Sequence, residues 1–309
     1  MTVNLRVSVL FLIGTILGLT HPASSQFLSN TDRIYDIPAV TGYEQALAAE
    51  IREQLKALSP KTDNLGNVYV TVGSGAPHRL IVTSMDEPGY VVSDITPDGY
   101  LRVQRLPQAP PNAVFDLLHA AQPVWIMTRS GKKISGVVAG LSLHLEPGRL
   151  NLPKMSHPDE MYVDIGAMSA EEVHAAGVDL LDPIALARKY QPIGNGGVAG
   201  PAVGDRFGCE TLLALLRHIR EAKTVGTTTV AFAAQQWTGG RGLDRLLNEL
   251  QPDEVIYVGR LMPPRSADGK TSPLQANSSQ AGVLLATDDI KKSPAGFAAE
   301  LVSLSAKSN

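Results

Sequence analysis

The sequence has almost no cysteine, few aromatic residues and no large excess of charge of either sign. Cys209 is the only cysteine in 309 residues, which excludes an intramolecular disulfide and a zinc site built from cysteines. The formal net charge is −3, and no basic cluster with interleaved aromatic residues occurs, so we expect no nucleic-acid partner. We expect Cys209 to be buried, because unpaired cysteine is among the most buried residue types.

After its first residues the chain also lacks any apolar run long enough to span a membrane. Near the start, Arg6 precedes an apolar stretch over residues 7–19, and the small residues Ala23 and Ser25 follow. A basic start, a short apolar run and small residues at a cleavage site are typical of a secretory signal peptide. We therefore expect residues 1–25 to be a signal peptide and the mature protein to be secreted or periplasmic, without membrane contact. An uncleaved N-terminal membrane anchor is the alternative.

The rest of the chain has an ordinary globular composition, 44% hydrophobic and 18% charged, and alternates between strand and helix patterns. Residues 41–58 have apolar residues at helical spacing, and Thr41 with Glu44 predicts a capping box at the start. Further helices are predicted at 206–222, 243–250 and 295–306, and strands at 68–72, 80–83, 227–234, 255–258 and 281–287. This alternation predicts an α/β fold with a mostly parallel sheet covered by helices.

Short strands separated by glycine turns interrupt this pattern in the middle of the chain. They are predicted at 90–92, 101–103, 124–127, 134–138 and 162–166. Closely spaced strands of this kind are typical of a small β-barrel. The sequence thus predicts a barrel domain at 89–190, inserted between two parts of the α/β domain at 26–88 and 191–309.

A polar segment, residues 83–89, follows one of the predicted buried strands and contains Ser84, Asp86 and Glu87. In an open α/β sheet, ligands bind at the carboxyl ends of the strands. Carboxylates at such an edge are costly unless they are paired, hydrogen-bonded or bound to metal. The segment indicates either a metal or acid–base cluster or a turn whose acids cap a neighbouring element.

Several motifs along the chain resemble those of the M42 metallopeptidases, which include tetrahedral and glutamyl aminopeptidases. The matching stretches are Val40–Glu44, Asn64–Val68, Met85–Glu87, Tyr162–Gly166 and Asp205–Cys209. The resemblance implies an α/β catalytic domain with an inserted β-barrel domain. It also implies two zinc or cobalt ions, removal of N-terminal residues from peptides, and assembly into dodecamers.

The same resemblance implies that the metal ligands and the general base are lost in this chain. The family's ligand positions are occupied here by Ser84, Gly204, Trp237 and Gly259. The position of the general base is occupied by Gln236, whose neutral amide cannot accept a proton from water near neutral pH. An indole offers only an N–H donor, so Trp237 cannot ligate a metal. The family's last ligand, a histidine, belongs to a C-terminal segment that we expect to be missing here.

Two functions are compatible with these substitutions. The first is an exported, catalytically inactive M42-like protein without a metal cofactor, in which the barrel allows homo-oligomers or co-assembly with an active relative. Its peptide ligand would be bound by Asp86, Glu87, Asp205, Arg206 and Trp237. The alternative is a metal-dependent aminopeptidase that binds two zinc or cobalt ions through Asp86, Glu87 and Asp205. Loss of the ligands together with the base favours the first.

Overall fold

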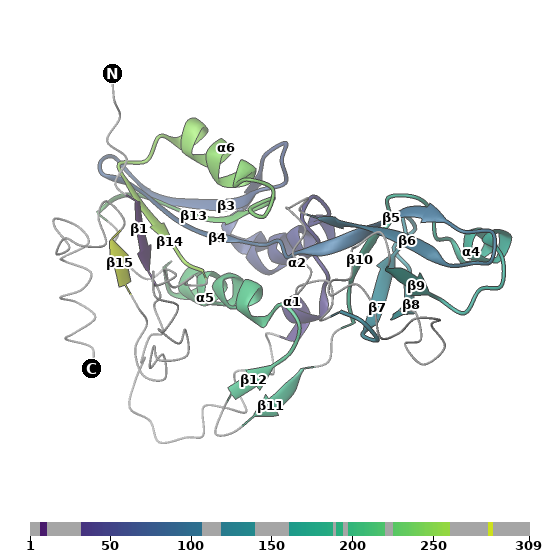
Figure 1. Cartoon of the computed structure of the whole chain (residues 1–309). Helices are drawn as coiled ribbons and strands as arrows, with labels where there is room; N and C mark the ends of the chain where they lie inside the picture. Colours follow the sequence, from purple (N-terminus) through teal and green to yellow (C-terminus); the bar gives the residue numbers. More distant parts are fainter. Residues whose placement is uncertain are drawn as a thin grey trace, which may run out of the picture.

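The computed structural model describes residues 7–10, 32–106, 119–139, 161–187, 190–193, 197–219, 225–259 and 284–286. Most of the expected signal peptide and the helix predicted at 295–306 lie outside these residues. Figure 1 shows a helix-covered sheet at one end of the molecule and a β-barrel at the other. This arrangement confirms the predicted α/β fold with an inserted barrel.

The sheet has seven strands in the order β15–β1–β14–β4–β13–β3–β2. Their bounds are Leu284–Ala286, Val7–Leu10, Glu254–Tyr257, His78–Ser84, Gly226–Ala233, Val68–Ser74 and Lys61–Thr62, in that spatial order. The central strands β1, β14, β4 and β13 are parallel, whereas β15, β3 and β2 pair in antiparallel fashion at the two sides. The sheet is therefore mixed, with its parallel part in the centre.

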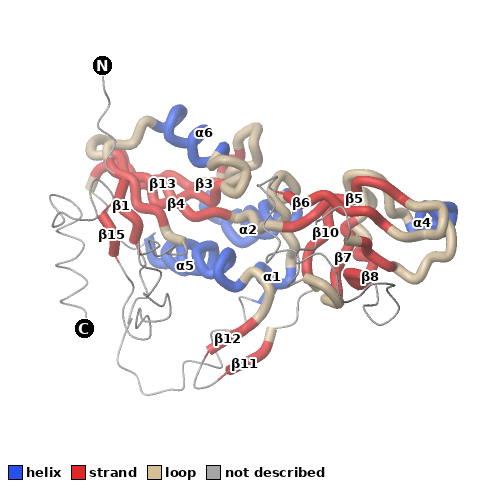
Figure 2. Tube along the Cα trace, viewed as in Figure 1, coloured by secondary structure: helices blue, strands red, loops and turns tan. Residues whose placement is uncertain are grey.

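Helices cover both faces of this sheet (Figures 1 and 2). One face carries α1 (Asp32–Asp36), α2 (Gln45–Leu55) and α5 (Val203–Ile219), whose apolar residues pack with those of β3, β13 and β14 in one core cluster. The other face carries α6 (Arg241–Leu250), which packs through Leu246. Because β4, β13 and β14 are covered on both faces, their sequences contain continuous apolar runs, at residues 80–82, 230–234 and 255–258.

The predicted capping box at the start of α2 is wrong. The helix begins at Gln45, and Glu44 makes no side-chain cap. Instead, the Thr41 amide donates to the Glu87 carbonyl at 3.0 Å, as part of a parallel β-bridge between Val40 and Glu87 beside the end of β4. A short 3₁₀ turn, η1 (Lys56–Leu58), ends the helical segment.

The barrel is closed, with the strand order β10–β5–β6–β9–β8–β7. Its strands span Pro183–Leu186, Gly89–Ile95, Leu101–Leu106, Tyr162–Asp164, Lys133–Ala139 and Pro123–Met127, in that order. The sequence predicted all of them except β10. A short helix, α4 (Ala170–Ala176), is capped by the Ser169 side chain, and β11 (Gln191–Ile193) pairs with β12 (Gly197–Ala199) in a separate ribbon.

The strand β1 lies within the segment that the sequence predicts to be a signal peptide. It pairs with β14 on one side and with β15 on the other. Cleavage after residue 25 stays a prediction, and it would remove β1 from the sheet. Within the described ranges, no helix combines the length and the apolar character that a membrane crossing requires.

Candidate functional site

The carboxyl end of β4 borders a cavity of about 280 Å³. The N-terminal turn of α5, the loop after β13 and the end of β14 complete its wall. The lining residues are Thr83, Ser84, Gly204, Asp205, Gly208, Gln236, Trp237, Tyr257 and Gly259. The structure thus brings together every family ligand position, and the base position, that the sequence analysis assigned within this chain.

The side chains in this cavity do not fit a pair of zinc or cobalt ions. Such a centre needs several carboxylate or imidazole ligands and a carboxylate base that activates water. Of the described residues that line the cavity, only Asp205 has an acidic side chain, and the others supply at most neutral oxygen atoms. Across the described ranges, no group of three or more His, Cys, Asp or Glu residues is placed to hold a metal ion.

Tyr257 occupies space beside the ligand positions, which sequence reasoning missed. Its hydroxyl donates to Ser84 Oγ at 3.2 Å, and burial, its largest influence, raises the pKa of Tyr257. A Cβ atom built on Gly259 would lie 2.4 Å from Tyr257 Cε1, so position 259 has no room for a carboxylate side chain while the ring stays in place. The feature of the sequence that indicates this contact is a large residue at position 257 two positions before the glycine at 259.

We expect Gly259→Ala to lower the free energy of unfolding by about 1–3 kcal/mol, the usual cost of overpacking a buried site. The added Cβ meets the Tyr257 ring, which must move. Urea denaturation measures the effect. The same substitution in a Tyr257→Ala background is the control and is expected to cost clearly less; an equal cost in both backgrounds would contradict the steric explanation.

Asp86 lies behind the cavity and is fully buried. Its Oδ1 accepts from the Gln236 amide at 3.0 Å and its Oδ2 from the Trp237 amide at 2.9 Å. Burial, the largest influence, raises the pKa of Asp86, and hydrogen bonds from Trp237, Thr41 and Gln236 oppose the shift. The carboxylate thus positions the loop after β13, and Asp86 is not among the residues that line the cavity.

Glu87 and Arg206 form a buried ion pair, with 3.3 Å between Glu87 Oε1 and Arg206 Nη2. Glu87 Oε1 also accepts from the Ala39 amide at 2.9 Å, and Arg206 Nη1 donates to the Met85 carbonyl. The pair therefore ties α5 to the end of β4. Neither residue is among those that line the cavity. Of the predicted peptide-binding residues, Asp205 and Trp237 line it, and peptide binding by the set stays a prediction.

Cys209 is buried as predicted. Its thiol donates to the Ser84 carbonyl at 3.3 Å, and burial raises its pKa to about 12. A thiol with so high a pKa is not a nucleophile at neutral pH. Cys209 therefore supports the strand end beneath the cavity and gives the site no chemistry of its own.

Glu44 is a second buried carboxyl group near the loop after β13. Its Oε1 accepts from the Gly42 amide at 2.8 Å and from the Gln235 amide at 2.9 Å. Burial, in first place, raises the pKa of Glu44, and the charge of Asp86 adds to the rise. The pKa of Glu44 is therefore higher in the folded state than in the unfolded state. The contribution of Glu44 to stability is complete at pH values below its unfolded-state pKa, and it is lost as the pH rises through its folded-state pKa.

We expect the stability of the Glu44→Gln variant to increase relative to that of the unmodified chain as the pH rises from about 4 to 7. The glutamine oxygen can keep both hydrogen bonds, because a single oxygen of Glu44 accepts them, and the amide does not ionise. Thermal denaturation across this pH range measures the difference. Glu53→Gln, an exposed substitution on α2, is the control, and a difference no larger than the control's would contradict burial as the cause.

The known proteins to which this chain is similar in sequence are described as aminopeptidases. The family model for M42 glutamyl aminopeptidase matches residues 66–309. The chain is 29% identical over 232 residues to the putative aminopeptidase FrvX of Escherichia coli, covering 73% of this chain and 62% of FrvX. It is 29% identical over 233 residues to the glutamyl aminopeptidase of Lactococcus lactis, covering 72% of this chain and 63% of that protein. The chain thus spans about three fifths of the length of these relatives.

Solved structures of TET peptidases are also similar to this chain. A TET aminopeptidase from a marine-sediment Thaumarchaeota archaeon superposes with a TM-score of 0.68 at 25% identity, over 77% of this chain and 66% of that one. The TET1 peptidase of Pyrococcus horikoshii gives a TM-score of 0.65 at 27% identity, over 79% of this chain and 72% of that one. The TET1 peptidase is described as able to assemble into a tetrahedron or a large octahedral shell.

Proposed function

The chain belongs to the M42 glutamyl aminopeptidase family, and from this membership we propose that it is an exported, catalytically inactive member that binds peptides instead of cleaving them. The observation that carries the proposal is the cavity at the end of β4. The ligand and base positions converge there on Ser84, Gly204, Gln236, Trp237 and Gly259, whose side chains cannot provide a two-metal centre.

The groups that remain in the cavity suit a nitrogen-bearing ligand. The Gln236 Oε1 atom is buried and has no hydrogen-bond partner within the described residues, and Asp205 adds a carboxylate to the lining. Both are acceptors, and Trp237 offers an aromatic surface beside them. An N-terminal ammonium group or an amide N–H of a peptide would satisfy the buried Gln236 oxygen, which otherwise costs stability.

Homo-oligomers, or co-assembly with an active relative, form part of the same proposal. The support is the structural likeness to the TET1 peptidase of Pyrococcus horikoshii, which is described as able to assemble into a tetrahedron or a large octahedral shell.

The alternative of an active enzyme with Asp86, Glu87 and Asp205 as ligands has less support. Both oxygens of Asp86 accept backbone amides, and Glu87 is paired with Arg206. Metal binding would have to break these buried interactions.

Elemental analysis of protein purified without chelator tests the proposal. We expect far less than one zinc or cobalt ion per chain after dialysis against metal-free buffer. An Asp205→Asn variant is the control for adventitious binding. One or more ions per chain that resist dialysis, and that are lost in this variant, would overturn the proposal in favour of the active enzyme.

A further inference from the structure

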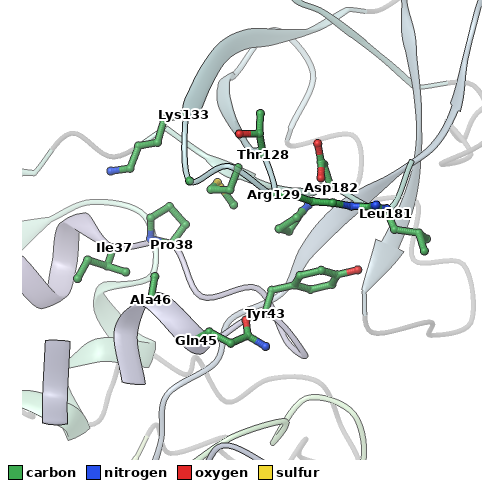
Figure 3. A pocket seen from close by; sticks show the side chains of 13 residues that line it. Ile37, Pro38, Tyr43, Gln45, Ala46, Thr128, Arg129, Lys133, Leu181 and Asp182 are labelled. Carbon is green, nitrogen blue, oxygen red and sulfur yellow. The ribbon is translucent and has the colours of Figure 1, made fainter. Parts of the chain in front are cut away.

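A second and larger cavity lies where the α/β domain meets the barrel. Its volume is about 600 Å³, within the range of ligand pockets, which often form between domains. The α/β domain contributes residues 37–46 to its wall, and the barrel contributes residues 127–133 and 181–183 (Figure 3). It shares no lining residue with the cavity at Ser84, so any ligand bound here is independent of the proposed function.

Two opposite charges border this cavity without neutralising each other. Asp182 is only 1% exposed, and its Oδ2 accepts from the Asp179 amide at 2.9 Å. Arg129 donates from Nη2 to the Leu180 carbonyl at 3.3 Å. In the described part of the chain, no ion pair joins Arg129 to Asp182 and no hydrogen bond uses Asp182 Oδ1. Asp182 Oδ1 is not among the buried atoms without a partner, so this oxygen is open to the cavity, where a ligand can reach it.

The other polar groups around the cavity have different roles. Lys133 Nζ donates to the Asp36 carbonyl at 3.3 Å and lies 4.4 Å from the centre of the Trp125 ring, so its charge already has partners. Tyr43 is half-buried, and in Figure 3 its ring lies below Arg129. Burial and then the charge of Asp182 raise the pKa of Tyr43, whereas Arg129 lowers it. The Tyr43 hydroxyl is therefore close enough to both charges for each of them to change its pKa.

The remaining wall is apolar and held rigidly. Ile37, Pro38 and Met127 form part of it, together with Leu181. Leu181 has a φ of 68°, an unfavourable conformation for a bulky residue, and its side chain is 58% exposed. Its amide donates to the Val92 carbonyl at 2.8 Å, which fixes the turn that carries both Leu181 and Asp182. The apolar side chain is thus displayed at the cavity instead of being buried.

We propose that this junction cavity binds a free α-amino acid with a large apolar side chain. The ammonium group would pair with Asp182 Oδ1, the carboxylate with the Arg129 guanidinium, and the side chain would contact Ile37, Pro38 and Met127. An amino acid carries an ammonium group and a carboxylate on one α-carbon. Such a ligand matches the opposite charges of Asp182 and Arg129, which influence each other without forming an ion pair. A simple anion would meet repulsion from Asp182, and a simple amine would bring no negative charge to Arg129.

Calorimetric titration of the full-length chain with L-leucine tests the proposal. A ligand of this size that fits well has an expected Kd of about 0.1 mM. Leucinamide, which lacks the carboxylate, and 4-methylpentanoate, which lacks the ammonium group, are each expected to bind about 10–100-fold more weakly. Because these comparisons use the unmodified chain, they do not depend on whether a variant folds.

Variants assign each charge to its partner. Arg129→Gln is expected to weaken leucine binding at least about tenfold while leaving leucinamide unaffected, and Asp182→Asn to weaken leucine while leaving 4-methylpentanoate unaffected. Arg102→Gln, on an exposed part of the barrel, is the control and should change nothing. The proposal is overturned if leucine fails to bind at about 10 mM, roughly a hundred times the expected Kd, or if both analogues bind as tightly as leucine.

Discussion

Purified protein supplied with zinc or cobalt is expected to hydrolyse aminoacyl chromogenic substrates at least about 10⁴-fold more slowly than an M42 aminopeptidase with an intact metal site. Loss of a general base alone removes about 10²–10⁴-fold, and loss of metal activation of water removes a further large factor. Here Gln236 stands at the base position, and Asp205 is the one acidic side chain among the described residues that line the cavity. The measurement is the initial rate with and without a chelator.

Contaminating host peptidases are the main source of false activity in this assay. A Gln236→Ala variant purified in parallel provides the control, because a contaminant's rate will not depend on this substitution. Turnover that a chelator abolishes, and that also falls in the variant, would contradict the proposed loss of catalysis.

Replacing Arg206 with methionine is expected to lower the free energy of unfolding by about 3–5 kcal/mol, the cost of leaving one partner of a buried ion pair without the other. Arg206 is fully buried and Glu87 is 3% exposed. Arg206→Met leaves Glu87 charged in the interior and removes the donor to the Met85 carbonyl. Urea denaturation at neutral pH measures the loss.

Arg245→Met is the matched control, because Arg245 pairs with Glu249 on the exposed surface of α6. Exposed pairs of this kind contribute about 0.2–1 kcal/mol. A Glu87→Gln substitution added to Arg206→Met should recover part of the loss, because it removes the unpaired charge. Equal effects of Arg206→Met and Arg245→Met would show that the buried pair does not brace α5 against β4.

Much of the fold could be predicted from local patterns in the sequence. Apolar runs between turns marked β4, β13 and β14, and glycine turns between short strands marked the barrel, whereas the residues of β1 were predicted to belong to a signal peptide. The prediction failed where contacts distant in sequence decide the local structure. Thr41 and Glu44 have the spacing of a capping box, but the Thr41 amide donates to the Glu87 carbonyl, and Glu44 accepts a hydrogen bond from the Gln235 amide. The strand β10 was missed because it begins with Pro183, and proline, which lacks the amide donor of a strand ladder, argues against a strand in the sequence.

The candidate site, like the fold, could be predicted only in part from the sequence. Its location followed from the family resemblance, and the structure gathers Ser84, Gly204, Gln236, Trp237 and Gly259 at one cavity. The roles of the neighbouring charged residues could not be read from the sequence. An acid beside a site can bind a ligand or support the backbone, and only the three-dimensional contacts separate the two.

Anomalous diffraction from crystals grown with an excess of zinc would test the loss of the metal centre most directly. We predict no ordered zinc in the cavity between Ser84 and Gly259, with the Tyr257 ring remaining in contact with Gly259. A fully occupied zinc ion in that cavity, bound by three or more side-chain oxygen or nitrogen atoms of this chain, would contradict it.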